Sequence, residues 1–247
     1  MLPILYQDDH YVAVNKPPGV LVHRTRLARG ERTAVLQQLR DQIGRWVSPV
    51  HRLDRPTSGV LLFALSEAAD AAMKAQFEAR AVDKLYLAVV RGWLEPPHGR
   101  VDYAVRPPRG HFADKVAYDT AVRQEAITDY WQLSQTEVPF PVRPYPQSRY
   151  ALLKLKPQTG RTHQLRRHMA HLAHPIIGDT KHGDGHHNQM FRERLGCERL
   201  LLTAVQLSFT HPFSGQRVTI MADPGAEFRQ VVAALGLGRI VVPPRGE

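Results

Sequence analysis

The chain has 247 residues, of which 43% are hydrophobic and 23% are charged, a globular composition that suits one large domain or two small ones. Its single cysteine, Cys197, excludes an intrachain disulfide framework, and its apolar runs fall far short of the roughly 20 residues of a membrane helix. Because Asp8 and Asp9 stand where a signal peptide would be basic, we expect a cytoplasmic protein without membrane association.

Positive charge is unevenly distributed along the chain. Lys and Arg total 33 against 23 Asp and Glu, which gives a net charge of +10. Residues 20–55 hold 8 arginines against 3 acidic residues, and residues 143–199 hold 11 Lys and Arg against 4. The second block also contains 7 of the 13 histidines. Two basic blocks on a nearly neutral scaffold favour binding of a polyanion, and the alternative is a solvated basic surface.

Hydrophobic periodicity predicts the elements in chain order. They are strands over 2–6, 11–15 and 20–23, a helix over 31–47 with Leu36, Leu39, Ile43 and Trp46 on one face, a strand over 59–65, a helix from its N-cap Ser66 to Arg80, strands over 84–90 and 149–156, a helix over 162–172, strands over 200–209 and 217–221, and a helix over 227–235. Six prolines indicate long loops in an insert at 104–147. We therefore expect an α+β fold with a largely antiparallel mixed sheet flanked by helices and loops. It forms one domain over residues 1–235 with a tail at 236–247.

Several common chemistries lack their sequence motifs. The chain has no Gly-rich loop followed by Lys-Ser/Thr, no Gly-x-Ser-x-Gly and no Cys-x-x-Cys. His168, His171 and His174 resemble a metal site, but a helix would spread them over about 200 degrees at about 100 degrees per residue. Pro175 ends that helix, and neighbouring arginines would repel a cation. We expect no bound metal.

The most distinctive local pattern is HRLDRPTSG at residues 51–59, which runs directly into the apolar stretch 60–63. It places Asp54 on a turn before a buried strand, with Arg52 and Arg55 on either side. One interpretation is a turn aspartate in a salt bridge. The other is a carboxylate that nearby arginines keep ionised for nucleophilic or base chemistry.

A second pattern is KLYLAVV at residues 84–90, in which Lys84, Tyr86 and Ala88 share one face of a strand. Tyr86 is either a core residue or a ring that stacks on a base, with a phenol able to exchange a proton.

A third pattern is PQTGRTHQLRRH at residues 157–168. The helix that begins near Thr162 would turn Leu165, Met169 and Leu172 to the core and His163, Arg166 and Arg167 to the opposite face. That basic face is either solvated or a site for an anion or RNA.

Together the three patterns resemble the RluA-type family of pseudouridine synthases. The resemblance is carried by His51-Arg52-Leu53-Asp54 with Thr57-Ser58-Gly59, by Lys84-x-Tyr86, and by Thr159 to Arg166 with His168 and the following His174-Pro175-Ile176-Ile177-Gly178-Asp179. It implies an isomerase that converts uridine in RNA to pseudouridine without cofactor or metal. One departure is Thr203, where relatives often have histidine.

The resemblance also implies roles for individual residues. Asp54 would be the essential carboxylate, Tyr86 would stack on the uracil and help remove its C5 proton, and Arg166 would pair with Asp54. Arg52 would help to extrude the target base and fill the gap that it leaves. The basic residues expected to contact RNA are Arg52, Arg55, Arg161, His163 and Arg167.

The substrate expectation rests on weaker likeness. Residues 4–8, Arg55-Pro56 and residues 143–150 are similar to the branch of the family that modifies uridine-65 of tRNA. Because a strand starts at residue 2, no N-terminal S4-like domain is expected, and the enzyme should be a monomer that holds tRNA through its own loops. The alternatives are a ribosomal RNA synthase of the same family, a non-catalytic RNA-binding module, and a carboxylate hydrolase of nucleosides or sugars.

Overall fold

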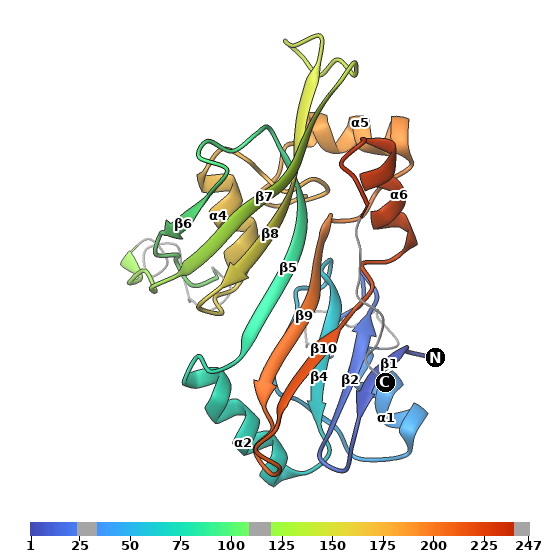
Figure 1. Ribbon diagram of the computed structural model, residues 1–247, viewed down its shortest axis with the longest axis vertical. Coiled ribbons are helices and arrows are strands. Elements are labelled where there is room, and N and C mark those ends of the chain that lie inside the picture. The colour runs from blue at the N-terminus through green and yellow to red at the C-terminus, as the bar shows by residue number, and fades with distance from the viewer. Residues whose placement is uncertain (24–33, 109–119, 240–247) are drawn as a thin grey trace. The chain divides into compact units, whose positions relative to one another are not determined.

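The computed structural model describes most of the chain, namely residues 1–23, 34–108 and 120–239. Within them the chain forms ten strands and five helices, most of which are labelled in Figure 1. These residues divide into two compact units, the first with residues 1–86 and 202–229 and the second with residues 87–201 and 230–239. Two elements, β5 (Asp83–Arg91) and α6 (Ala226–Ala234), therefore contribute residues to both units.

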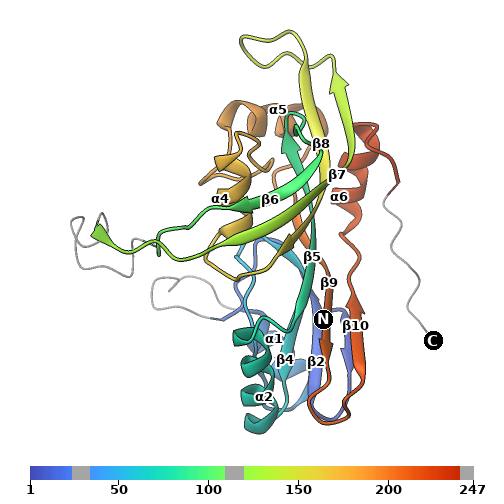
Figure 2. The same ribbon diagram turned by 60° about the vertical axis from the view of Figure 1, so that its left-hand side comes forward.

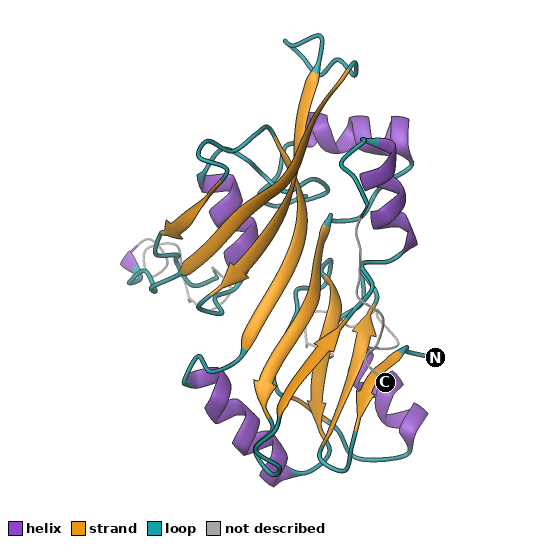
Figure 3. Ribbon diagram, viewed as in Figure 1, coloured by secondary structure: helices purple, strands orange, loops and turns teal. Residues whose placement is uncertain are grey.

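The first unit is built on a mainly antiparallel sheet, shown in orange in Figure 3. Its strands are β1 (Ile4–Gln7), β2 (Tyr11–Lys16), β3 (Ser48–Pro49), β4 (Ser58–Ala64), β9 (Leu202–Thr210) and β10 (Arg217–Met221). β2 lies between β1 and β4, β3 adds to β4, and β10 adds to β9, all antiparallel. Only β4 and β9 pair in parallel among these. At Gly59 (φ 111°) a Cβ would lie 2.0 Å from the Ala204 carbonyl oxygen, so only glycine fits this crossing.

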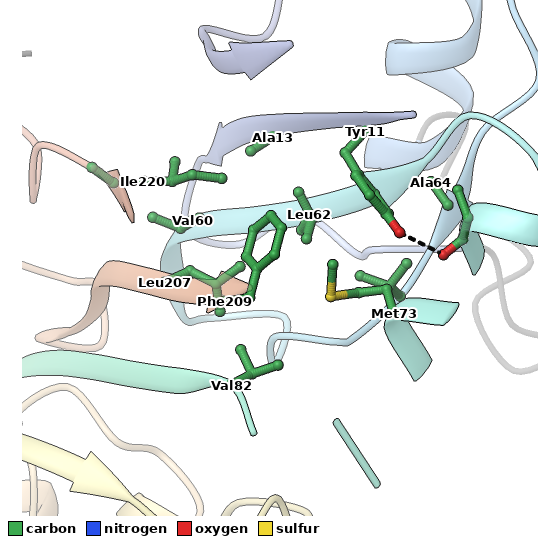
Figure 4. Close-up of a cluster of buried hydrophobic side chains, with 13 residues drawn as sticks. Tyr11, Ala13, Val60, Leu62, Ala64, Met73, Val82, Leu207, Phe209 and Ile220 are labelled. Carbon is green, nitrogen blue, oxygen red and sulfur yellow. Dashed lines mark hydrogen bonds between the residues drawn. The ribbon is translucent and has the colours of Figure 1, made fainter. Parts of the chain in front are cut away.

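Strand β4 is buried over its whole length because helices cover both faces of the sheet. Leu61 lies in a cluster with side chains of α1 (Val35–Ile43), whereas Leu62 lies in another with Met73 of α2 (Glu67–Glu78). Figure 4 shows the second cluster, in which the Tyr11 hydroxyl donates a 3.0 Å hydrogen bond to a carbonyl of α2. Burial on both sides explains the uninterrupted apolar sequence before and after Leu62.

Helix α1 is shorter than the predicted helix over 31–47. It ends at Ile43 because Gly44 adopts φ 65° and donates its amide to the Arg40 carbonyl at 2.9 Å. Trp46 therefore lies beyond the helix and is 49% exposed, so its predicted place on the apolar face is wrong. Residues 31–33 of the prediction lie outside the described residues.

The predicted strand over 20–23 is also wrong. The carbonyls of Leu21 and Val22 accept hydrogen bonds from the Val35 and Leu36 amides, at 2.9 and 3.0 Å. This segment thus satisfies the first amides of α1, which would otherwise lack partners. In contrast, the predicted N-cap of α2 is confirmed, since the Ser66 hydroxyl accepts from the Ala69 amide.

The second unit holds the remaining sheet strands in the order β5-β8-β7-β6. Its further elements are β6 (His98–Asp102), β7 (Ile127–Val138), β8 (Ser148–Pro157), α4 (Gln164–His171) and α5 (Gly185–Leu195). β7 pairs antiparallel with both β6 and β8, and Figure 2 shows the long β7–β8 hairpin. α4 packs against β8. The predicted mixed fold with a largely antiparallel sheet is confirmed.

The prediction of long loops over 104–147 is wrong for part of this range. Residues 127–138 form β7, whose side chains largely alternate in burial. The prolines of this insert lie at 107, 108 and from Pro139 onward, so the stretch that forms β7 contains none and can donate every ladder hydrogen bond. Residues 109–119 lie outside the described part.

Helix α5 has no counterpart among the predicted elements. Its buried side chains include the polar Asn188 beside Met190 and Phe191, which obscures an apolar stripe. Asn188 instead ties the helix to the preceding loop, because its amide accepts from the Gly178 backbone at 2.7 Å and donates to the Asp179 carbonyl at 3.0 Å. None of the described helices is long and apolar enough to cross a membrane.

Candidate active site

The turn that carries Asp54 is held by a buried lysine. Lys16, at the end of β2, is fully buried, and its ammonium donates to the carbonyls of Pro17, Arg55 and Thr57 at 2.9, 3.0 and 2.8 Å. The Thr57 amide closes the turn on the Asp54 carbonyl at 3.0 Å. Two of the three acceptors follow Asp54 within three residues, so the lysine fixes the backbone between Asp54 and the start of β4.

His51 anchors the other end of the same turn. Its Nε2 accepts a hydrogen bond from the Leu62 amide of β4 at 3.1 Å, and its ring stacks on Phe77 of α2 at 5.0 Å between centroids. Burial, with a smaller contribution from the positive charge of Lys84, lowers the pKa of His51 to about 3. The ring is therefore neutral at physiological pH and remains an acceptor for the strand.

Tyr86 and Asp54 lie in the same unit and interact electrostatically. Tyr86 is half-buried and packs against the cluster that includes Leu53. Burial raises the pKa of its phenol, and the negative charge of Asp54 raises it further. The hydroxyl therefore keeps its proton at neutral pH. The two residues that the first two sequence patterns singled out are thus brought together.

Arg166 is buried, so its predicted position on an exposed basic face is wrong. Its Nε and Nη2 each donate to one carboxylate oxygen of Asp179, both at 2.7 Å, in a bidentate pair. Burial alone would raise the pKa of Asp179, but the hydrogen bonds from Arg166 and from the His182 amide hold it below its usual value. Asp179 was part of the family resemblance, but no role was predicted for it.

The motif around Arg166 is fixed by a buried polar network. The Gln164 amide donates to the Ile127 carbonyl at 2.9 Å and to the Thr128 hydroxyl at 3.0 Å, and it accepts from Thr159 at 2.7 Å. His168, also buried, contacts the same Thr128 hydroxyl at 2.9 Å. These polar residues bind α4 to the start of β7 and therefore position Arg166. Their hydrogen bonds are made within the protein.

The predicted RNA contacts fall in both units. Arg52 and Arg55 are exposed on the Asp54 turn, and Arg55 also donates to the Gly19 carbonyl at 2.9 Å. In the second unit, Arg161 donates to the Glu125 carbonyl at 3.1 Å and Arg167 to the Arg106 carbonyl at 2.5 Å. The His163 ring contacts the His182 ring, with 2.9 Å between Nδ1 and Nε2. Burial lowers the pKa of His182 to about 4, which leaves that ring neutral.

The three histidines that resembled a metal site have separate partners. His168 contacts Thr128, His171 stacks on Tyr103 at 3.7 Å, and His174 contacts the Arg91 carbonyl at 2.9 Å. Across residues 1–23, 34–108 and 120–239 no three potential ligands are grouped for a metal ion.

Comparison with known proteins identifies the family of the chain. The sequence profile of the RNA pseudouridylate synthase family matches residues 10–171. The chain belongs to this family. Two similar proteins are the tRNA pseudouridine synthases C of Vibrio vulnificus, 52% identical over 94% of either chain, and of Pasteurella multocida, 54% identical over 94% of this chain and 95% of the other.

Solved structures agree with this assignment. Human RNA pseudouridylate synthase domain containing 4 superimposes with a TM-score of 0.70 at 25% identity, covering 95% of this chain and 93% of the other. Human RNA pseudouridylate synthase domain containing 1 gives 0.69 at 27%, covering 90% and 83%. The predicted RluA-type resemblance is confirmed, and this RNA pseudouridylate synthase is an isomerase that acts on RNA. A non-catalytic module and a sugar hydrolase are thereby set aside.

Proposed function

We propose that this enzyme isomerises a uridine of tRNA, at position 65, to pseudouridine, and that Asp54 is its essential carboxylate. The observation that carries the proposal is the Asp54 turn, which Lys16 and His51 fix beside Tyr86. The tRNA substrate is supported by relatives named tRNA pseudouridine synthase C that are 52% and 54% identical.

The reaction needs no net gain or loss of atoms. The bond between the ribose C1′ and uracil N1 breaks, the uracil rotates, and a bond forms between C1′ and C5. The proton on C5 leaves and N1 gains one. Asp54 supplies the carboxylate that this sequence requires at the ribose or the uracil, and its neighbours hold it in a defined position, which favours catalysis by orientation.

Tyr86 acts in this scheme as a neutral ring. Its raised pKa keeps the phenol protonated, so it stacks on the uracil and offers a hydrogen-bond donor beside Asp54. The phenolate needed to take the C5 proton directly is scarce at neutral pH. Tyr86 therefore orients the base and assists a proton transfer rather than serving as a standing base.

Arg166 is assigned as the cation that pairs with Asp54. This role is the one that the family resemblance implies. Asp179 takes the edge of the guanidinium formed by Nε and Nη2 and so fixes the plane of Arg166.

Access to the target uridine requires that it leave its helix, at a cost of a few kcal/mol. Arg52, which is exposed on the Asp54 turn, would fill the gap that the base leaves. Contacts of Arg55, Arg161, His163 and Arg167 with the RNA backbone would offset the cost. The chemistry that we propose uses no cofactor.

The decisive experiment replaces Asp54 by Asn, which keeps the shape and removes the charge. We expect tritium release from RNA labelled at uracil C5 to fall by at least about three orders of magnitude, while binding of RNA persists. Turnover near the wild-type rate would exclude Asp54 as the essential group.

A separate assay tests the substrate. The wild-type enzyme is incubated with tRNA and ribosomal RNA from a strain that lacks its gene, and pseudouridine is mapped chemically. We expect modification of tRNA at position 65. Modification of ribosomal RNA alone would refute the tRNA assignment without affecting the Asp54 result.

A further inference from the structure

Two lysines of the first unit differ sharply in their partners. The ammonium of Lys16 is fully buried and satisfied by three carbonyl oxygens. Lys84, at the start of β5, is half-buried, and no described residue forms a hydrogen bond or an ion pair with it. The charge of Lys16 therefore holds three carbonyl groups in the free protein, whereas the charge of Lys84 holds no described group by a hydrogen bond or an ion pair.

Lys84 belongs to the same corner of the unit as the candidate active site. By the alternation of a strand it shares a face with Tyr86, two residues later. Its charge acts on His51, three residues before Asp54. The site is thus lined by a cation that none of its neighbours neutralises.

Apart from Asp54, whose negative charge acts on Tyr86, the described groups near Lys84 do not offer it an anion. His51 is neutral and uses Nε2 as an acceptor for the Leu62 amide. The adjacent carboxylate of Asp83 accepts from Arg217 at 2.5 Å. Burial lowers the pKa of Lys84, which reflects the cost of holding its charge away from water.

An unpaired, partly buried ammonium is costly to a folded protein, and pairing with an anion would offset that cost. The ligand of an RNA-modifying site carries one anionic group per nucleotide, the phosphodiester. We propose that Lys84 binds a phosphodiester of the RNA substrate next to the nucleotide that reacts. This inference rests on the proposed active site at Asp54 and Tyr86, and it adds a binding residue to it.

The test measures RNA affinity without turnover. Each variant is made in the Asp54→Asn background, and binding of an unmodified tRNA transcript is followed from low to physiological salt. We expect Lys84→Gln to weaken binding about tenfold at low salt and to reduce the slope of log affinity against log salt by about 0.7–0.9, the value for one lost phosphate contact. Lys84→Arg should restore both quantities.

Lys74→Gln is the matched control, because Lys74 is an exposed lysine of the same unit that pairs with Asp70 at 2.5 Å. It should leave the affinity and the slope unchanged. An unaltered slope for Lys84→Gln, at any affinity, would refute the proposal. It would mean that Lys84 neutralises no phosphate of the bound RNA. Wild-type turnover of tRNA is measured separately, so failure of the proposed function is seen on its own.

Protein stability separates binding from a structural role. We expect Lys84→Met to keep or raise the urea midpoint of the free enzyme, because it removes a charge without partners. Lys16→Met should lower it strongly, since three carbonyls lose their donor. A loss for Lys84→Met as large as that for Lys16→Met would overturn the proposal.

Discussion

Tyr86 combines a stacking face with a hydroxyl whose proton is held by burial and by the charge of Asp54. Tyr86→Phe keeps the ring and removes the hydroxyl. If the phenol assists proton transfer, single-turnover formation of pseudouridine should fall by about 10²–10⁴, the usual contribution of such a group, while RNA affinity changes less than twofold. An unchanged rate constant would limit Tyr86 to stacking.

The bidentate pair of Arg166 and Asp179 gives a second prediction for a single residue. Asp179→Asn removes the charge of the carboxylate that forms the buried bidentate pair with Arg166, and breaking such a pair costs about 3–5 kcal/mol. We expect urea unfolding at pH 7 to show this loss, together with reduced activity because Arg166 is no longer oriented.

The difference in stability between the wild type and Asp179→Asn should depend on pH. The reason is that the pKa of Asp179 is lower in the folded protein than in the unfolded chain. The carboxylate therefore stabilises the fold fully above the unfolded value of about 3.9, and this contribution disappears as pH falls through the folded value. Wild type and variant should converge in stability toward low pH. A difference that stays constant down to pH 2 would contradict the ionic origin.

Among the elements, β4 is the one whose core position most directly supports the site, because it continues the Asp54 turn and is buried on both faces. Leu62→Ala should destabilise the protein by about 2–5 kcal/mol through lost burial and a cavity. Leu133→Ala is the control, since Leu133 is 51% exposed on β7 and should change the free energy of unfolding by less than about 0.5 kcal/mol. Equal effects in urea titrations would contradict this account of the core.

The sequence predicted those elements whose side-chain pattern is local. The apolar run of β4 and the Ser66 cap of α2 are written in consecutive residues, so both were found. β7 and α5 were missed because prolines surround the first and a buried asparagine interrupts the second. The sequence motif singled out Arg166 as a candidate site residue but did not predict its burial. Its buried partner, Asp179, lies on a loop beyond the helix and outside the local pattern.

At the scale of the whole molecule, positive charge is present in both units, through the blocks 20–55 and 143–199. If these blocks meet RNA phosphates, affinity must depend strongly on counter-ion release. For about six phosphate contacts we expect tRNA binding to weaken by about 10³ between 50 and 200 mM salt. Filter binding over this range checks the expectation, and a change below tenfold would show that the basic blocks lie away from the RNA.

The parallel pairing of β4 with β9 has a consequence for synthesis. Ser58 pairs with Thr203, which the ribosome adds about 145 residues later. At roughly 5–20 residues per second, β4 waits about 7–30 s for this neighbour. During that interval an apolar strand that already adjoins the Asp54 turn has an open edge. The nascent enzyme is therefore exposed to mispairing of β4 until β9 has been translated. A chaperone that covers this edge would prevent such mispairing before the enzyme binds RNA.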